Sequence, residues 1–221
     1  MKKISGVIFD MDGLLLDTEA IYSRVNIEIA PKWGIEGYDE TTYMEEIGLG
    51  EKAVHAKYFK DYAQLPKESI DGFFKDTRQI IEREFLEKGA PLKSGVLELM
   101  AYLKEQNIPM VVASSNHREA INNLLAKAGI LSDFKGSVSG DEVTHAKPHP
   151  EIVEKAVALL GTKPEETLML EDSLNGIRAS HVAGVPVIMV PDILPANDEA
   201  REKAYAIEPD LLAVLELIKN K

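Results

Sequence analysis

The sequence predicts an α/β protein in which a Rossmann-like, doubly wound parallel sheet carries an inserted α-helical cap domain. Short apolar runs recur along the chain, and a helical pattern follows each of them. The runs are continuously hydrophobic rather than alternating, which is typical of parallel strands covered on both faces. One long stretch after the first run shows only helical patterns. Strands that alternate with helices favour a doubly wound sheet, and the strand-free stretch favours an insertion.

The expected elements follow one another in a regular order. Strands are expected at residues 7–10, 110–114, 136–140, 167–172 and 185–190. Helices are expected at residues 95–106, 117–128, 150–160 and 174–183, with a final amphipathic helix near 209–219. Gly129, Gly161 and Gly184 each follow one of these helices, at the position where a glycine commonly ends a helix.

The strand-free stretch begins at Thr18, soon after the first strand. Its helical patterns are interrupted by several glycines and by Pro66. The segment KGAPLKSG, residues 88–95, has the glycine, proline and serine content of a hinge linker. We therefore expect residues 1–17 and 88–221 to form the Rossmann-like core and residues 18–87 to form the cap domain.

Composition limits the classes of partner and site. The 221 residues carry a formal net charge of −12, which argues against nucleic acid or an anionic membrane as a partner. The absence of cysteine excludes disulfides, thiolate metal sites and cysteine nucleophiles. No apolar run approaches the roughly 20 residues that span a membrane, and no signal-peptide pattern precedes the first strand. We expect a cytoplasmic protein, a monomer or weak homodimer, that acts on a small molecule.

Polar residues cluster where the expected strands end. They are Asp10 and Asp12, then Ser114, Ser115 and Asn116, then Glu171 and Asp172. Lys147 lies between the last two groups and precedes a proline, which favours an extended or turn conformation. Ligands bind at the carboxyl ends of the strands in open α/β sheets. The pattern predicts a binding site for a divalent cation together with an oxyanion.

The first strand ends in two aspartates, Asp10 and Asp12, separated by one methionine. Two like charges this close are costly unless a cation or a proton lies with them. A calcium loop is a poor explanation, because it requires glycine at its sixth position and a bidentate glutamate at its twelfth. Counted from Asp10, glycine is fourth and Ile21 is twelfth. We expect Mg²⁺, which takes hard oxygen ligands.

The chain resembles the haloacid dehalogenase-like hydrolase superfamily in four motifs, which come in this order: the DMDG…DT stretch, an apolar strand ending in Ser114, a lysine–proline pair at Lys147, and an apolar strand ending in Glu171 and Asp172. The likeness covers essentially the whole chain. It is greatest to members with a small helical cap, which include sugar-phosphate phosphatases, nucleotide-type monophosphatases and β-phosphoglucomutase. The resemblance implies that Asp10 is a nucleophile that forms an aspartyl-phosphate and that Asp12 is the general acid and base.

The resemblance also implies a set of Mg²⁺ ligands. These are the Asp10 carboxylate, the backbone carbonyl of Asp12 and the Asp172 carboxylate, with Glu171 a further ligand or a residue that orients one. Read without the resemblance, Glu171 and Asp172 could instead be a charge pair at a helix N-terminus that Ser173 caps.

The remaining motif residues are implied to bind the phosphoryl group. Ser114 would hydrogen-bond it, helped by backbone N–H groups of Ser115 and Asn116 at the start of the next helix. Asn116 could equally cap that helix in combination with Glu119. Lys147 would neutralise both the nucleophile and the phosphoryl oxygens, so that one anion can attack another.

Residues outside the core motifs are less informative. Thr18, Glu19 and Tyr22 begin the cap, and we expect them to face the core site and bind substrate. The histidines do not recur at metal-ligand spacing, so we expect ordinary surface or packing residues: His55, His117, His145, His149 and His181.

We expect the reaction to be hydrolysis, with two alternatives. β-Phosphoglucomutase-like proteins carry a histidine a few residues beyond the DT of the first motif and an arginine after the glycine turn of the cap. This chain has Tyr22 and Glu51 at about those positions, which places mutase activity second. A non-catalytic phosphate-binding regulatory module is third, because it has no need of both Asp10 and Asp12. The sequence therefore predicts an Mg²⁺-dependent phosphatase of a sugar phosphate or a nucleotide-like monophosphate.

Overall fold

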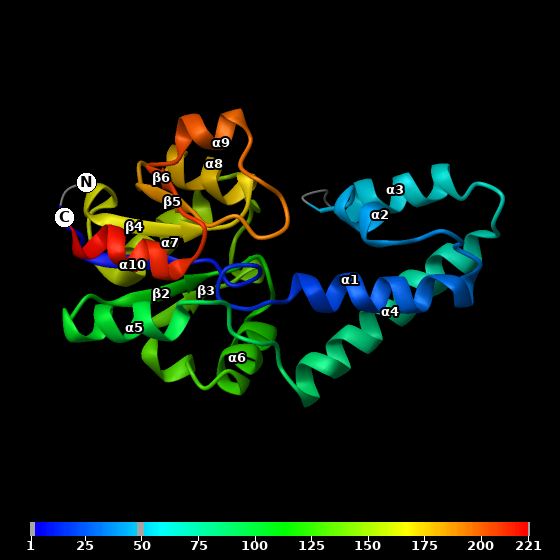
Figure 1. Cartoon of the computed structure of the whole chain (residues 1–221), viewed down its shortest axis with the longest axis horizontal. Coiled ribbons are helices and arrows are strands. Elements are labelled where there is room, and N and C mark those ends of the chain that lie inside the picture. The colour runs from blue at the N-terminus through cyan, green and yellow to red at the C-terminus, as the bar shows by residue number, and fades with distance from the viewer. Residues whose placement is uncertain (1–2, 48–50, 221) are drawn as a thin grey trace. The chain divides into compact units, whose positions relative to one another are not determined.

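The structure is a computed structural model that describes residues 3–47 and 51–220 (Figure 1). The side chains of residues 51 and 52 lie outside this description. The argument against a mutase depends partly on Glu51, so that part of it lies outside the described residues as well. The chain forms two compact units. We call Met1–Asp17 with Ala90–Lys221 the sheet unit, and Thr18–Gly89 the helical unit.

The sheet unit is built on parallel strands: β1 (Gly6–Phe9), β2 (Met110–Ala113), β3 (Gly136–Val138), β4 (Thr167–Glu171), β5 (Val187–Met189) and β6 (Ala206–Ile207). Across the sheet they run in the order β3-β2-β1-β4-β5-β6, and every neighbouring pair is parallel. This is the strand order of a doubly wound sheet, so the predicted Rossmann-like α/β class is confirmed. The edge strand β6 was not expected, because two residues are too few to give a periodic pattern.

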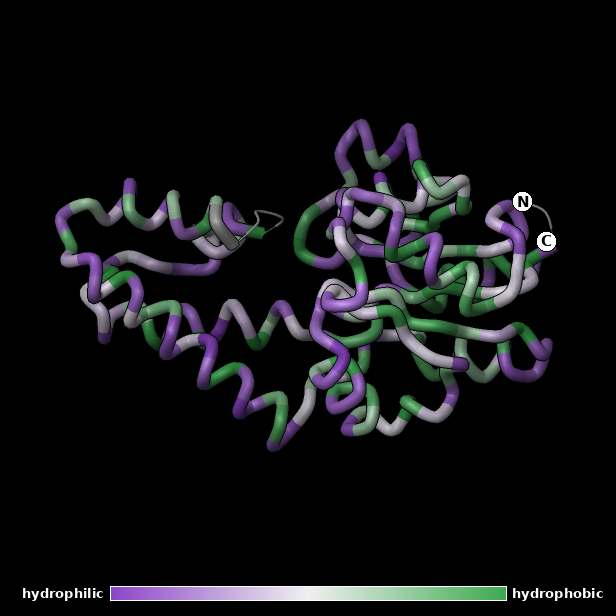
Figure 2. The backbone as a smooth tube through the Cα atoms, turned by 180° about the vertical axis from the view of Figure 1, so that it is seen from behind, coloured by the Kyte–Doolittle hydropathy of each residue, from purple (hydrophilic) through white to green (hydrophobic). Residues whose placement is uncertain are grey.

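Both faces of the sheet are buried, which explains the continuous hydrophobic runs. Ile8 is in register with Val111 of β2 and with Met169 of β4, and the three pack in one apolar cluster with α7 (Glu151–Leu160). Side chains alternate along a strand, so Val7 and Phe9 face the other side, where both are fully buried. Hydrophobic colouring accordingly follows the central strands (Figure 2).

Helices connect the strands as predicted, with small shifts at their ends. Besides α7 they are α5 (Val96–Glu105), α6 (Arg118–Lys127), α8 (Leu174–Val182), α9 (Asp198–Lys203) and α10 (Leu211–Lys219). Short 3-10 turns lie at Leu131–Asp133, Gly140–Glu142 and Pro164–Glu166. α5 packs beside α10 (Figure 1). The six-residue α9 was not expected; Asn197 caps it by accepting a hydrogen bond from the Ala200 N–H at 2.8 Å.

The helical unit contains no strand within its described residues. It consists of α1 (Glu19–Ile29), a 3-10 turn (Ala30–Trp33), α2 (Glu40–Met44), α3 (Glu51–Asp61) and α4 (Lys67–Glu87). α1 packs along α4. The core of the unit is aromatic: the ring of Tyr58 stacks on that of Phe73, with centroids 5.4 Å apart. Gly72 is required in α4, because a Cβ there would lie 2.3 Å from the Trp33 ring.

The two connections between the units run side by side within the sheet unit. Leu16 and Leu92 form an antiparallel bridge. The Asp17 N–H donates to the Pro91 carbonyl at 2.9 Å, and the Lys93 N–H donates to the Leu15 carbonyl at 3.0 Å. The chain therefore leaves and re-enters the sheet unit at adjacent points. None of the helices in the described ranges is long and apolar enough to cross a membrane.

Candidate active site

The predicted strand-end residues converge because their strands are neighbours. β2, β1 and β4 lie next to one another and are parallel, so their carboxyl ends meet at one edge of the sheet. Asp10 follows β1, Ser114 follows β2, and Glu171 is the last residue of β4. All three are buried, with 6%, 0% and 1% of their surface exposed. Polar groups this deeply buried need partners, and each of the three finds them in neighbouring side chains or backbone groups of the same site.

Lys147 joins the ends of these strands. Its Nζ donates to Asp10 Oδ1 at 2.5 Å, to Glu171 Oε2 at 2.9 Å and to the Ala113 carbonyl at 3.2 Å. The side chain is 6% exposed. Burial alone would lower the pKa of Lys147, but the charges of Asp10 and Glu171 outweigh it and hold the pKa above its usual value. The Lys147 ammonium group therefore keeps its positive charge in direct contact with Asp10.

Glu171 is held in place by Ser173, Lys147 and the close approach of Gly176. Its Oε1 accepts hydrogen bonds from the Ser173 N–H at 3.0 Å and the Ser173 hydroxyl at 2.6 Å, while Oε2 accepts from Lys147. Gly176 lies directly against the carboxylate, since a Cβ there would be 2.0 Å from the carboxyl carbon. These contacts favour Glu171 as the residue that orients Lys147, although its carboxylate still lies within reach of a shared ion. Ser173 also caps α8 by accepting from the Gly176 N–H, as the sequence suggested.

Three carboxylates form a cluster able to hold a cation. Asp10, Glu171 and Asp172 each offer an oxygen, and these oxygens all lie within 4.8 Å of one another. Burial, then the charge of Glu171, raises the pKa of Asp10 to about 8, although Lys147 opposes the shift. Burial and the same neighbour raise the pKa of Asp172 well above its ordinary value. One lysine does not balance three acids, so the donor set fits a hard divalent cation.

Asp12 points back toward the end of β2. Its Oδ2 accepts a hydrogen bond from Asn116 Nδ2 at 2.8 Å and from the Ser114 hydroxyl at 3.4 Å. The Asn116 N–H in turn donates to the Ser114 hydroxyl at 3.1 Å. Asn116 therefore uses its side chain to position Asp12, which the sequence did not predict. The alternative that Asn116 caps α6 is wrong, because His117 occupies that position. Ser115, between Ser114 and Asn116, is exposed.

Gly13 allows the turn that separates Asp12 from the rest of the first motif. Its φ is +72°, a region that favours glycine. A Cβ at this position would lie 2.5 Å from Asp172 Oδ2 and 3.0 Å from Asp192 Oδ2. Any side chain here would displace the Asp172 carboxylate. The expectation that Gly13 turns the backbone sharply is confirmed.

Asp192, which follows β5, was missed by the sequence reasoning. Its Oδ1 accepts from Lys93 Nζ at 2.5 Å, whereas its buried Oδ2, which lies against Gly13, has no hydrogen-bond partner among the described residues. Asp192 and Lys93 line a cavity of about 320 Å³, together with Asp17 and Asp210. The signal available in the sequence was an aspartate three residues beyond β5, in VIMVPD.

The three residues expected to bind substrate from the cap belong to the helical unit. Thr18 is fully buried, and within residues 3–47 and 51–220 its hydroxyl has no hydrogen-bond partner. Glu19 Oε2 accepts from the Tyr43 hydroxyl at 2.5 Å. Tyr22 packs edge to face on Phe85, with ring centroids 5.7 Å apart. Their role toward a substrate stays a prediction.

The expectation that no histidines group at metal-ligand spacing is wrong for two of them, although both are surface residues as expected. His145 and His149 lie together, with ring centroids 4.5 Å apart. With Glu151 they form a second group in which one ligand atom from each residue lies within 4.8 Å of the others. The spacing was missed because the residues belong to a turn before α7, where neither a helical nor a strand period applies.

The sequence and the fold were compared with known proteins. Residues 7–190 match the family model of haloacid dehalogenase-like hydrolases. Hexitol phosphatase B of Escherichia coli K12 is 29% identical over 89% of this chain and 88% of that protein. The "probable pseudouridine-5'-phosphatase" of Drosophila melanogaster is 32% identical over 87% of this chain and 84% of that protein. The crystal structure of the "putative beta-phosphoglucomutase" of Thermotoga maritima has a TM-score of 0.82 and is 28% identical, covering 98% of this chain and 99% of that one.

Proposed function

The chain belongs to the haloacid dehalogenase-like hydrolase family, and from that premise we propose that it is an Mg²⁺-dependent phosphatase that acts through an aspartyl-phosphate. It is a phosphoric monoester hydrolase, as the phosphatases among its relatives are. The observation that carries the proposed mechanism is the buried contact of Lys147 with both Asp10 and Glu171. It places a permanent positive charge beside a carboxylate at the end of the central strand.

In the first step, an Asp10 carboxylate oxygen bonds to phosphorus while the ester P–O bond breaks. Asp12 donates a proton to the leaving oxygen, which departs as an alcohol. Asn116 and Ser114 hold the Asp12 carboxylate for this transfer. In the second step, Asp12 takes a proton from water, whose oxygen bonds to phosphorus as the Asp10–phosphorus bond breaks. Inorganic phosphate leaves, and both carboxylates return to their starting states.

The cation is proposed because Asp10 must be ionised to attack. With a pKa of about 8 in the protein alone, much of Asp10 would carry a proton at neutral pH. Asp10 and Asp172 would hold Mg²⁺, with the backbone carbonyl of Asp12, while Glu171 orients Lys147. When bound, the cation supplies positive charge to the nucleophile and the phosphoryl oxygens.

The proposed substrate is a small phosphorylated metabolite, either a sugar or polyol phosphate or a nucleotide-like monophosphate. The names of the two relatives point to one substrate of each kind, a hexitol phosphate and pseudouridine 5'-phosphate. We propose that the helical unit is the cap and that Thr18, Glu19 and Tyr22 contribute to the choice between them. The cytoplasmic location expected from the sequence stays a prediction.

The second candidate is a β-phosphoglucomutase, favoured by the name of the Thermotoga maritima structure. A mutase must hold a bisphosphorylated intermediate, which requires a second phosphate contact of high affinity. Tyr22 stands near the position of the expected histidine and packs on Phe85. Glucose 1-phosphate turnover that requires a bisphosphate activator and releases little phosphate would favour the mutase.

Phosphate release over a panel of sugar phosphates, polyol phosphates and nucleoside monophosphates tests the proposal. The measurement compares Mg²⁺ with EDTA, and Asp10→Asn with Asp198→Asn, which changes an exposed carboxylate in the same way. We expect Mg²⁺-dependent release that Asp10→Asn abolishes and Asp198→Asn keeps. Rapid acid quenching of the wild type should trap a hydroxylamine-sensitive acyl phosphate. Normal turnover by Asp10→Asn would contradict the proposed nucleophile.

A further inference from the structure

A group of potential metal ligands lies outside the acidic cluster, in the segment HAKPHPE between β3 and α7. His145 and His149 are exposed, and Glu151 is the first residue of α7. Lys147 lies between the two histidines in sequence, but its side chain is buried and serves Asp10 and Glu171. The two histidines and Glu151 have no part in the mechanism proposed above.

The atoms of this group have the separations of ligands to one ion. His145 Nδ1 lies 3.5 Å from Glu151 Oε2. Two ligands of a tetrahedral ion that binds nitrogen and oxygen at 2.0–2.1 Å lie about 3.4 Å apart. The His145 and His149 rings have centroids 4.5 Å apart and are inclined by 31°. A small rotation of the exposed side chains is enough to complete a three-ligand set.

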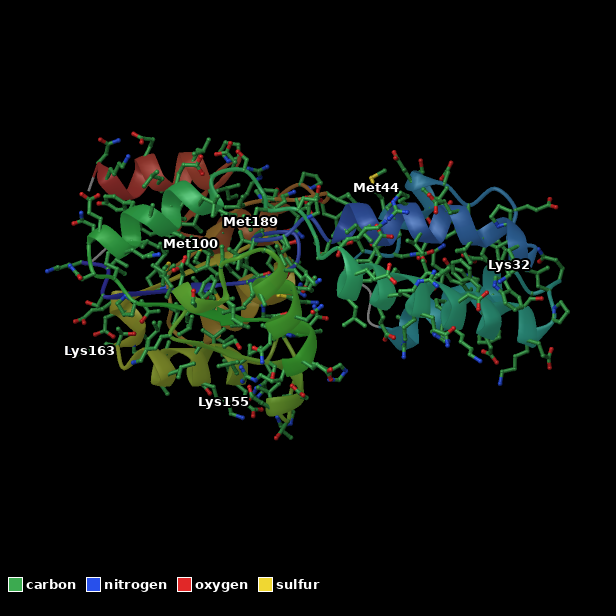
Figure 3. The ribbon with its side chains drawn as sticks, turned by 90° about the horizontal axis from the view of Figure 1, so that it is seen from below. Lys32, Met44, Met100, Lys155, Lys163 and Met189 are labelled. Atoms are coloured by element: carbon green, nitrogen blue, oxygen red, sulfur yellow. The ribbon has the colours of Figure 1, made fainter. Side chains whose placement is uncertain are left out.

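Glu151 is already fixed in position. Its carboxylate accepts hydrogen bonds from the backbone N–H groups of Thr144 at 3.1 Å and His145 at 3.0 Å, and from Lys155 Nζ at 2.8 Å. The contact with Lys155, followed by the bond from Thr144, lowers the pKa of Glu151 to about 2. Lys155 projects from α7 at the outside of the sheet unit (Figure 3). An ionised and oriented carboxylate loses little freedom when it binds a metal.

A metal bound at His149 Nδ1 would replace one hydrogen bond. The Glu151 N–H donates to His149 Nδ1 at 3.3 Å, which is a long hydrogen bond. The N-terminus of α7 slightly disfavours a nearby cation. Two imidazole–metal bonds and a carboxylate outweigh this, and the net charge of −12 favours cations in general.

We propose that His145, His149 and Glu151 form a binding site for a divalent transition metal of the Zn²⁺ class. Imidazole ligands suit Zn²⁺, Co²⁺ and Ni²⁺, whereas Mg²⁺ takes oxygen ligands and is predicted for the acidic cluster. The chain thus carries two cation sites of different selectivity, linked by the segment that contains Lys147. The open side of the exposed site leaves room for water as a fourth ligand.

The test is a titration of the metal-free protein with Zn²⁺ by calorimetry, in the Asp172→Asn variant so that the acidic cluster is weakened. Three proteins are compared: this variant alone, the same with His145→Ala and His149→Ala, and the same with His181→Ala. His181 is exposed on α8 and is the matched control. Imidazole ¹⁵N chemical shifts report the nitrogen atoms involved, without any need for activity.

We expect one equivalent of Zn²⁺ in the Asp172→Asn protein and in the His181→Ala control, and its loss in the double-histidine variant. In two additional variants, His145→Ala alone and His149→Ala alone should each weaken the affinity at least tenfold. The His145 and His149 signals should shift, and Mg²⁺ should not displace the metal. No bound equivalent, the same equivalent after both histidines are removed, or an equal loss in the control would each overturn the proposal. Unaltered circular dichroism verifies that the variants fold.

Discussion

The nucleophile proposed for this enzyme should destabilise the protein that contains it. Asp10 is 6% exposed and lies beside Glu171, and its pKa is about 8 in the folded chain against an ordinary value of 3.8. The folded state therefore keeps a proton that the unfolded state releases between about pH 4 and pH 8. Stability is fully present below this window and falls as the pH rises through it. Asp10→Asn removes the ionisable group and should remove this loss.

The size of the effect follows from the same pKa. One pKa unit corresponds to about 1.4 kcal/mol, so the shift from 3.8 to about 8 amounts to about 6 kcal/mol when Asp10 is fully ionised, and to about 5 kcal/mol at pH 8, where half of it is ionised. In the absence of a cation, Asp10→Asn should be more stable than the wild type at pH 8 by up to this amount. The two proteins should be nearly equal at pH 4. Mg²⁺ should narrow the difference at pH 8 by stabilising the wild type.

Urea denaturation followed by circular dichroism, in EDTA and in Mg²⁺, measures the free energy of unfolding at both pH values. Asp198→Asn is the control, because it removes an exposed carboxylate with the same change of shape. The control should stay within about 0.5 kcal/mol of the wild type at each pH. If Asp10→Asn were no more stable than the wild type at pH 8 in EDTA, the reasoning about a buried, cation-free carboxylate cluster would be refuted.

Three further changes test the site. Lys147→Met should lower kcat at least about a hundredfold, because the charge that offsets the attacking anion is lost. Steady-state phosphate release measures kcat, and unchanged turnover would show that Lys147 has no part in the mechanism. Asn116→Ala should lower kcat about tenfold by releasing the Asp12 carboxylate, and a shift in the pH–rate profile should distinguish it from simple unfolding. Gly13→Ala should weaken Mg²⁺ binding at least about tenfold, since its Cβ would displace Asp172; calorimetry measures the affinity, and a wild-type value would contradict the close approach.

Much of the fold could be predicted because its signals are local. The run VIFD and its counterparts are hydrophobic without alternation, and the structure buries β1 completely on both faces. Asp10, Ser114 and Glu171 follow three such runs, so parallel pairing alone brings them together. The expectation required only that strands of one sheet end at one edge.

What could not be predicted depends on pairs that are far apart in sequence or lack a period. Asn116 and Asp12 meet across 104 residues, and no spacing within either motif indicates that the amide turns toward the carboxylate. Lys93 and Asp192 meet across 99 residues in the same way. His145 and His149 meet in an irregular turn whose shape depends on bonds from Thr144 and His145 to Glu151.

The bridge between Leu16 and Leu92 has an evolutionary consequence. Because the two ends of the insert lie next to each other, the chain has only a short gap to span between Leu16 and Leu92. Another folded insert, or a short turn, could span the same gap at low entropic cost. In the part of the chain that the structure describes, the strands of the sheet unit pair with one another. We therefore expect that the segment from Thr18 to Gly89 can be replaced by another folded segment without loss of the sheet. If the proposed function is correct, recombination at the bridge between Leu16 and Leu92 would exchange the insert and change the substrate. The residues proposed for phosphoryl transfer in the sheet unit would be kept.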